Sequence, residues 1–499
     1  MFFKGCPQVD WTLQRTMAQF SQATVVALGL LSSGIAQAAG VAAYGEAIER
    51  ALASNPSVVA AYHEFEAARQ GQRAAEGGLY PSIDLNADAA RESRETPLND
   101  FGDYDRDSVR FSVSQLLFDG FQTRDLARAQ GHLKLARYHD FHDVSQTIAL
   151  DATVAYLQTV KFQTLVGYAE DNYVFHRQIF DKIAERVAAG RDEGVNLEQA
   201  TARMALAESN LLTEVTNLYD TRTEFQRVVG EVPAEKLPMP SIPLGALPSL
   251  RTEALQLALI NSPEIKRAAE EIKSAKQQYG ATRGPMYPRF DLRYRNEQET
   301  NTQGFRGDYD LQAIELVVTY NLYRGGGDSA RRRESYHRYY SAIENHKQAC
   351  LDVRRQTSIA FNNVTVLEQQ VQFLQQQLTA QDKTRRAYGD QFDRRKRTLL
   401  DLLDSQNEYF NTQRALLSAQ VDLMSAQATV LAELGVLTDS LDASGFNADK
   451  MADVRDELAT QTEDLVASCG AELVPSVDID KDALFQRLNA RAAASDAAP

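Results

Sequence analysis

Two short segments of the chain decide its fold: residues 79–89 read LYPSIDLNADA and residues 286–296 read MYPRFDLRYRN. In each segment a Tyr-Pro pair ends a helical pattern, and apolar and polar residues alternate after it. A period of two is typical of a strand with one apolar and one polar face. Each half of the chain is therefore predicted to change from helix to strand at its Tyr-Pro pair. The four residues are Tyr80, Pro81, Tyr287 and Pro288.

The similarity of the two segments extends outward from them. Residues 46–85 align with residues 253–292 without gaps, at a constant offset of 207, with 15 identities in 40 positions. Further on the offset becomes 205 and holds as far as Gly230 and Gly435. The chain is thus predicted to contain two internal repeats that differ by two residues in one loop.

Each repeat is predicted to have the same order of elements. A helix (residues 44–76 or 251–282) precedes a strand of about ten residues, and a polar loop (92–107 or 297–309) leads to a return strand. A helical region without proline follows, over residues 121–188 or 329–391, and a shorter helix ends the repeat. At 1.5 Å per residue, such a region is roughly 100 Å long, more than a globular core can contain.

Glycines mark the turn from each return strand into its long helix: Gly120 in the first repeat, and Gly325 and Gly326 in the second. The glycine run at residues 325–327 superficially resembles a phosphate-binding loop, but it lacks the Gly-Lys-Ser/Thr ending. We therefore interpret these glycines as supplying the backbone freedom of a sharp turn.

Composition and charge exclude several classes of function. Lysine and arginine total 53 against 68 aspartates and glutamates, a net charge of −15, so no nucleic-acid partner is expected. The three cysteines show no metal-ligand spacing and no disulfide framework. His132, His139 and His142 are expected to be solvated. Because no catalytic constellation is visible either, we expect no enzyme activity, no cofactor and no metal.

The N-terminus has the pattern of a secretory signal peptide. Lys4 and Arg15 precede an apolar run at residues 23–31, and Ala36-Gln37-Ala38 follows as a cleavage signal. The start of translation is Met1 or Met17, which the sequence does not decide. Beyond the leader we find no window with the ~18 apolar residues of a membrane helix, so a membrane role would have to use strands.

Four amphipathic strands cannot close a barrel by themselves. Backbone groups in lipid need partners, and small transmembrane barrels have at least eight strands, so the open edges would have to pair with other subunits. The alternative is a β-hairpin on a soluble coiled-coil stalk. The predicted domains are a signal peptide at 1–38, the first repeat at 39–232, a proline-rich linker at 233–250, the second repeat at 251–437 and an acidic, flexible tail at 438–499.

Asp401 and Asp404 form the one carboxylate pair that invites a functional interpretation. They lie three residues apart, on one helix face, directly after the cationic run at residues 394–397. In an isolated helix they would be a solvated helix start. In a closed ring of subunits they would become two stacked rings of carboxylates, which select cations.

Taken together, these features resemble the TolC-like outer-membrane efflux and type I secretion channels over residues 42–437. The resemblance is carried by residues 79–81 and 286–288, by the strand exits at 117–121 and 322–326, and by RTLLDLLD at 397–404. It implies an α+β membrane protein: a homotrimer whose twelve-stranded transmembrane β-barrel, four strands per subunit, continues into a long α-helical periplasmic barrel.

The resemblance also assigns roles to single residues. The family's two selectivity aspartates fall on Asp401 and Asp404, and its gating arginine falls on Arg397. Its gating tyrosine is replaced by Phe392, and the aspartate that this tyrosine contacts is replaced by Asn196. Because Asn196 carries no charge, Arg397 cannot form the family's salt bridge to that position. The gate is therefore expected to be latched less firmly or through other residues.

The resemblance implies an outer-membrane exit duct of a tripartite export system, in contact with outer-membrane lipid and with its helical tunnel in the periplasm. We expect type I protein secretion first, with an inner-membrane ABC exporter and a periplasmic adaptor protein. The alternative is small-molecule or multidrug efflux with a proton-driven pump. An alternative of another class is a secreted coiled-coil structural protein.

Overall fold

A computed structural model of the chain describes residues 40–98, 100–441, 469–470, 483–484 and 486. The predicted signal peptide and most of the predicted acidic tail lie outside these residues. The helices and strands below all belong to one unit, Val41–Pro499.

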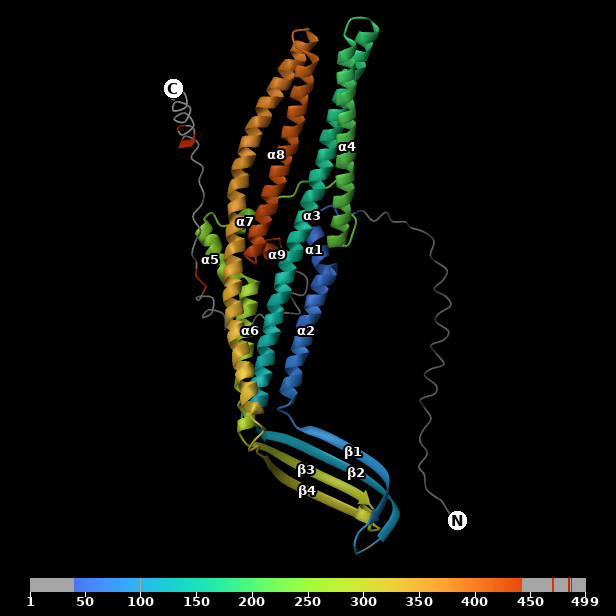
Figure 1. Cartoon of the computed structure of the whole chain (residues 1–499), viewed down its shortest axis with the longest axis vertical. Coiled ribbons are helices and arrows are strands. Elements are labelled where there is room, and N and C mark those ends of the chain that lie inside the picture. The colour runs from blue at the N-terminus through green and yellow to red at the C-terminus, as the bar shows by residue number, and fades with distance from the viewer. Residues whose placement is uncertain (1–39, 99, 442–468, 471–482, 485, 487–499) are drawn as a thin grey trace, which may run out of the picture. The chain divides into compact units, whose positions relative to one another are not determined.

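The two halves of this unit have the same order of elements (Figure 1). The first half contains α1 (Tyr44–Ser54), α2 (Pro56–Gly77), β1 (Ser82–Glu95), β2 (Asp100–Phe118), α3 (Gln122–Ala188) and α4 (Gly194–Val229). The second contains α5 (Arg251–Asn261), α6 (Pro263–Ala281), β3 (Arg289–Thr300), β4 (Asp308–Thr319), α7 (Gly327–Asp393) and α8 (Leu399–Glu433), followed by α9 (Leu437–Ser440). Three short 3₁₀ helices are η2 (Leu244–Ala246), η3 (Gly284–Met286) and η4 (Thr302–Gly304).

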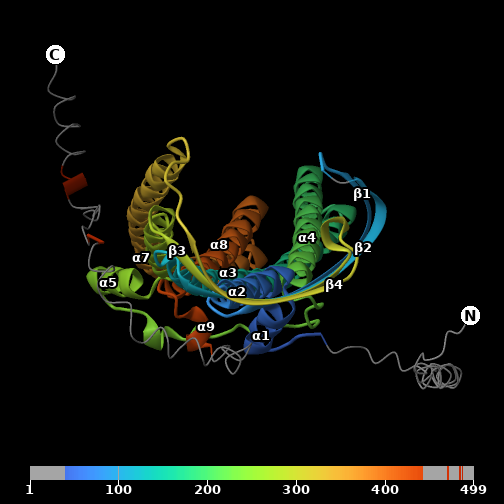
Figure 2. The ribbon, with the colours of Figure 1, turned by 90° about the horizontal axis from the view of Figure 1, so that it is seen from below.

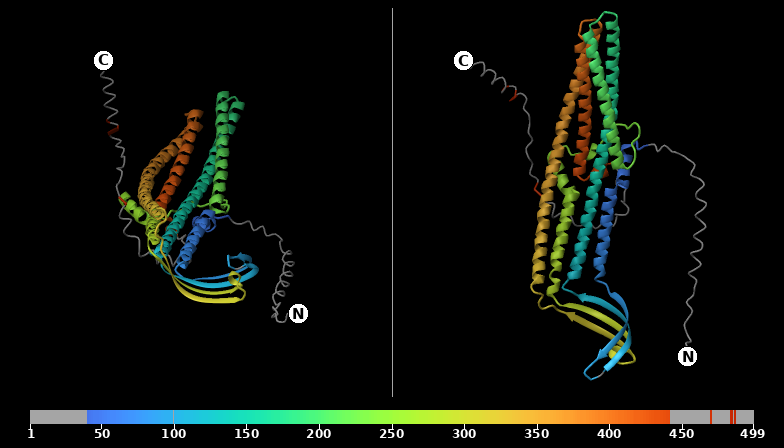
Figure 3. Two further views of the ribbon diagram at one scale, coloured as in Figure 1. Left: turned by 60° about the horizontal axis from the view of Figure 1, so that its bottom comes forward. Right: turned by 45° about the vertical axis from the view of Figure 1, so that its right-hand side comes forward.

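The predicted helices are present, and local sequence explains where they break. The first predicted helix of each half is divided at an Xaa-Pro step, where Asn55 caps α2 by accepting from the Ser57 N–H at 3.0 Å and Ser262 caps α6. The long helices α3 and α7 have 67 residues each, about 100 Å of helix. Helix α6 lies between them near the sheet, and helix α8 lies between them farther from it (Figure 3).

The four strands form one antiparallel sheet in the order β1-β2-β3-β4 at one end of the helices (Figure 1). They have 14, 19, 12 and 12 residues, so the prediction of about ten was too short. The predicted loop at 297–309 is present but shorter, since β3 continues to Thr300 and β4 begins at Asp308. The predicted loop at 92–107 was wrong, because most of its residues extend β1 and β2. Their charged side chains pair across strands, as Arg106 does with Glu92 at 2.7 Å, and this hid the alternating pattern.

One face of the sheet is apolar, and nothing in the described chain covers it. Ile83 pairs with Val113 and Leu85 with Phe111 across β1 and β2, while Tyr294 pairs with Ile314 and Leu292 with Leu316 across β3 and β4. Ile83, Leu85 and Ile314 are 69%, 70% and 77% exposed. A monomer in water would leave this surface unburied.

The opposite face of the sheet is polar and is held by ion pairs. Arg110 bonds to Glu297 at 2.6 Å across β2 and β3, and Arg295 bonds to Glu297 at 2.8 Å and to Glu315 at 2.5 Å. Arg106 adds a contact to Asp88 at 2.8 Å between β2 and β1. The sheet is also curved, as seen from below in Figure 2. Such a sheet presents apolar side chains to one medium and charges to another.

The helices share their main apolar core midway along α3. Its largest members include Tyr156, Phe65, Phe225 and Ile48, all of them fully buried. A second core joins α5, α6, α7 and α8 around Leu255, Ile265 and Val353. On α8, Leu416, Ala419 and Val430 are buried, and Leu423 and Ala426 pack against the second core.

Helix α8 is long and apolar enough to pass as a membrane span by length and composition, with a mean hydropathy of 1.2 in its best window. The expectation that no window beyond the leader would qualify was therefore wrong by a narrow margin. Half of that window is buried inside the unit. We interpret α8 as a core helix packed on α3 and α7.

Candidate functional site

The residues predicted to form the gate lie at the helix tips farthest from the sheet, where α3 turns into α4 and α7 into α8 (Figure 1). A small apolar core closes this end, and Phe392 is one of its members, only 6% exposed. It packs with Ile183, Leu399 and Leu402. Phe392 is therefore a core side chain of this end of the unit.

Asp404 forms an ion pair that joins the two halves of the chain. The Arg203 guanidinium of α4 donates to its Oδ1 at 2.6 Å. A second pair lies further along the same two helices, where Arg414 of α8 donates to the buried Glu214 of α4 at 2.5 Å. Helices α4 and α8 are thus joined twice. These partners could not be predicted from the sequence, because residues some 200 positions apart form no local pattern.

Asp401 lies in the first turn of α8 and is bound within that turn. The Thr398 hydroxyl donates to its Oδ2 at 2.8 Å, and Arg397 lies 3.6 Å from the same oxygen. These two contacts, the hydroxyl first, lower the pKa of Asp401. Its carboxylate is therefore ionised at neutral pH. The side chain is 39% exposed, so the charge can interact with ions in solution.

Arg397 and Asn196 each bind neighbours in their own turn. The Arg397 guanidinium donates to Gln391 Oε1 at 2.9 Å and lies over the Tyr388 ring at 4.2 Å. Asn196 Nδ2 donates to Asp192 Oδ1 at 2.6 Å, and this bond is the main reason why the pKa of Asp192 is lowered. Tyr388 lies one helical turn before Phe392, and its cation–π contact with Arg397 was not predicted from the sequence.

The glycines at the strand-to-helix turns have left-handed backbone angles: φ is 70° at Gly120, 63° at Gly325 and 78° at Gly326. Gly120 also lies against the second half of the chain, because a Cβ there would be 2.9 Å from Gly284 Cα. Next to it, Asp119 caps α3 by accepting from the Thr123 N–H at 2.9 Å.

The residues that begin the strands lie at the sheet's helix-proximal margin. Tyr80 and Tyr287 are 70% and 52% exposed, just before Pro81 and Pro288. Phe118, at the end of β2, packs edge-on against Tyr287 with ring centroids 6.4 Å apart. At the far margin of the sheet, Phe101 packs against Phe305 at 5.1 Å.

Two expectations for titratable residues need correction. His139 is buried, and burial lowers its pKa to about 3, so it is not solvated. His132 is bound to Glu270 through Nδ1 at 2.8 Å. In the same middle region, burial and the nearby carboxyls of Asp143 and Glu264 raise the pKa of Glu433 to about 7.

No disulfide framework was expected, and the described residues contain one disulfide. Cys350 of α7 is bonded to Cys469, with their Cα atoms 5.6 Å apart. Removal of the leader would leave two of the three cysteines in an exported chain, and this even number was the available signal. His346, one turn before Cys350 on α7, lies beside the bond.

Comparisons with known proteins agree with this geometry. The family model described as "Outer membrane efflux protein" matches residues 47–231 and again residues 254–436. The outer membrane efflux protein BepC of Brucella suis biovar 1 is 24% identical over 332 residues, covering 66% of this chain and 72% of BepC. The proteases secretion protein PrtF of Dickeya chrysanthemi is 23% identical over 430 residues, covering 82% of this chain and 91% of PrtF.

The fold is also similar to solved structures. The outer membrane protein VceC of Vibrio cholerae superposes with a TM-score of 0.69 at 18% sequence identity, covering 79% of this chain and 96% of VceC. At this identity the match concerns the arrangement of helices and strands.

Proposed function

The chain belongs to the outer membrane efflux protein family, the TolC-like channels of the outer membrane, and from this premise we propose that three copies of it form a passive exit duct. Each copy contributes four strands to a twelve-stranded barrel, which the long helices continue as a tunnel in the periplasm. A periplasmic adaptor protein and an inner-membrane pump complete the export system. Family membership argues against the alternative of a secreted coiled-coil structural protein.

The open sheet carries this proposal. In the described chain β1 and β4 each have a neighbour on one side only, so two rows of backbone N–H and C=O groups need partners. Lipid supplies none, and its apolar interior matches the exposed apolar face of the sheet. A ring of subunits satisfies both requirements, because β4 of one copy can pair with β1 of the next.

The other sheet face supports a polar lumen. Its residues form a continuous set of cross-strand ion pairs around Glu297, which is 9% exposed. Charges so arranged are costly in lipid and compatible with water. The curvature of the sheet gives the barrel wall an inside and an outside (Figure 2).

The helices support a ring of subunits as well. Helix α7 exposes apolar side chains at intervals of seven residues, among them Ile359, Val366 and Phe373, each about half exposed. Helix α4 exposes Leu212, Val215 and Tyr219 at intervals of three and four residues. These are the spacings of helices that pack along a shared seam. We assign the two stripes to the contact between neighbouring subunits.

For the cargo, we propose type I protein secretion with an ABC exporter. PrtF, which is named for the secretion of proteases, aligns with this chain over 91% of the length of PrtF. Efflux of small molecules with a proton-driven pump is the second candidate, because BepC is named as an efflux protein. Deletion of the gene in its host separates the two: loss of a secreted protein supports secretion, and increased drug sensitivity with unchanged secretion supports efflux.

We further propose that the tip formed by α3, α4, α7 and α8 is the gate and that Asp401 and Asp404 line it. Three subunits would place three carboxylates at each level, which favours cations. In a planar bilayer, the purified mature protein should show discrete channels, and Asp401→Ala with Asp404→Ala should reduce cation selectivity and block by multivalent cations. Unchanged reversal potentials would contradict the assignment of these aspartates, and the absence of channels would contradict the duct.

A further inference from the structure

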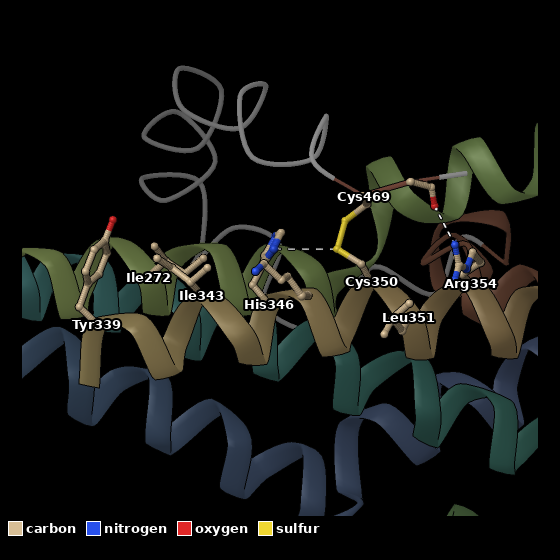
Figure 4. Close-up of a pocket in the computed structure, with 10 residues that line it drawn as sticks. Ile272, Tyr339, Ile343, His346, Cys350, Leu351, Arg354 and Cys469 are labelled. Atoms are coloured by element: carbon tan, nitrogen blue, oxygen red, sulfur yellow. Dashed lines mark hydrogen bonds between the residues drawn. A yellow bond between two sulfur atoms is a disulfide. The ribbon is translucent and has the colours of Figure 1, made fainter. Parts of the chain in front are cut away.

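A cavity beside the disulfide contains a set of ligand atoms that the exit-duct function does not use (Figure 4). It has a volume of about 530 Å³ and is lined by α6, α7 and the tail residues Cys469 and Gly470. The imidazole of His346 and the sulfurs of Cys350 and Cys469 border it, and their ligand atoms all lie within 4.8 Å of one another.

Helix geometry explains why two of these groups meet. His346 and Cys350 are four residues apart on α7 and therefore share one face of the helix. His346 Nδ1 lies 3.9 Å from Cys350 Sγ. For a tetrahedral ion with M–S near 2.3 Å and M–N near 2.0 Å, the separation between sulfur and nitrogen ligands is about 3.6 Å. The pair is therefore already spaced almost as two ligands of one ion would be.

The third group is held in place by contacts besides the disulfide. Arg354, one turn after Cys350, donates to the Gly470 carbonyl at 3.5 Å. Cys469 also packs against the apolar core of α5, α6 and α7. When the disulfide is reduced, rotation about the side-chain bonds alone would let the two sulfurs separate to ligand distance.

The ligand atom of His346 is Nδ1, which faces the Cys350 sulfur. The side chain is only 3% exposed, and within the described residues its second nitrogen, Nε2, has no hydrogen-bond partner. Lys347 and Arg354 also line the cavity.

We propose that His346, Cys350 and Cys469 form a redox-conditional site for a soft d¹⁰ cation such as Zn²⁺, closed while the disulfide is intact and open when it is reduced. A dithiol reductant would convert the protein disulfide into two thiols and itself become a disulfide. On binding, two metal–sulfur bonds form and the thiol protons are released to solvent. The cavity leaves a fourth position for water. In both states Cys469 stays linked to α7.

The test uses the full mature protein in detergent, treated with a dithiol and desalted without oxygen. Thiol titration should count two free thiols per chain after reduction and none before. Zn²⁺ competition against a chromophoric chelator should show one tight site per reduced chain and none in the unreduced chain. Co²⁺ should give a sulfur-to-metal charge-transfer band in the reduced protein alone.

Variants separate this site from nonspecific binding. Cys350→Ser and Cys469→Ser should each abolish the tight site, and His346→Ala should weaken it at least tenfold. His337→Ala, an exposed histidine on the same helix, is the matched control and should bind as the wild type does. If a variant proves unstable, the comparison of Zn²⁺ binding between the reduced and the unreduced wild type still tests the site. Equal Zn²⁺ binding before and after reduction would overturn the site, and wild-type affinity in His346→Ala would remove the histidine from it.

Discussion

Arg203 and Asp404 form the residue-scale contact with the clearest consequence for gating. The pair joins α4 to α8 at 2.6 Å, and its side chains are 29% and 48% exposed. An ion pair with this exposure contributes about 0.2–1 kcal/mol. Each subunit of a trimer would carry one such ion pair, so the three small contributions to the stability of the closed state would add up.

We therefore predict that Arg203→Gln increases the closed-state conductance of the channel in a planar bilayer severalfold. Arg177→Gln is the control, because Arg177 pairs with Asp181 inside α3 and forms no ion pair with another helix among the described residues. Equal closed-state conductance of Arg203→Gln and the wild type would show that this pair does not hold the gate.

Glu433 gives a second residue-scale prediction, which concerns pH. Burial, with Asp143 and Glu264 nearby, raises its pKa from 4.5 to about 7 in the folded chain. Between about pH 4.5 and 7 the unfolded chain therefore binds fewer protons, and the free energy of unfolding falls as the pH rises. The loss at pH 8 amounts to up to about 3 kcal/mol.

Glu433→Gln should remove this loss. The variant should melt at a higher temperature than the wild type at pH 8, and at nearly the same temperature at pH 4.5. His139 contributes the opposite slope, since its pKa is lowered to about 3, but it is present in both proteins and cancels in the difference. Glu408→Gln, an exposed position on the same helix, is the control. A constant difference between the variant and the wild type across this range would contradict the assignment.

Single residues also mark the limit of what the sequence can predict about the site. Asp401 and Asp404 could be identified, because a carboxylate pair beside a cationic run is a local pattern. Arg203 could not be identified as their neighbour, because it is brought near only when α4 packs on α8. The sequence shows that Asn196 replaces an aspartate of the family pattern. It does not show that Asn196 binds Asp192, because this contact depends on the geometry of the turn.

At the scale of elements, the strand-to-helix turn after β2 depends on close contact between the two halves. Gly120 and Gly325 occupy corresponding turns, and both have positive φ. An alanine Cβ at position 120 would lie 2.9 Å from Gly284 Cα, whereas one at position 325 meets nothing within 4 Å. An alanine at either position would therefore have the same backbone strain, but only an alanine at position 120 would also have a steric contact.

We predict that Gly325→Ala destabilises the protein by about 1–2 kcal/mol through the left-handed backbone alone. Gly120→Ala should cost about 1–3 kcal/mol more, since Gly284 has to move. Thermal unfolding of the two variants in the same detergent measures the difference. Equal melting temperatures would show that the contact between Gly120 and Gly284 is not tight.

The elements also show why the sequence predicted helices better than strand ends. Proline-free helical periodicity placed the ends of α3 and α7 within two residues. The outer parts of the strands carry charges on both sides, so their alternation of apolar and polar residues fades. Glu92 of β1 and Tyr104 of β2 fell within a predicted loop for that reason, yet the two residues pair with each other.

At the scale of the whole molecule, the outer edges of β1 and β4 have no partner strand within the described chain. Strands β1 and β4 lie at opposite margins of the sheet, three intervals of about 4.8 Å apart, or roughly 14 Å. A disulfide requires Cα atoms within about 7 Å, so β1 and β4 of one chain cannot be linked. In a ring of subunits, β4 of one copy would lie beside β1 of the next.

The most direct test of the exit duct is therefore a cysteine cross-link between these strands. In a background with Cys350 and Cys469 replaced by serine, Ala87→Cys on β1 is combined in turn with cysteine at positions 310, 312, 314, 316 and 318 of β4, which lie on the same sheet face. At one or two of these positions oxidation should give covalent trimers on a non-reducing gel, and each single-cysteine variant should remain monomeric. If every combination stays monomeric and the mature protein is freely soluble without detergent, the chain does not form a barrel.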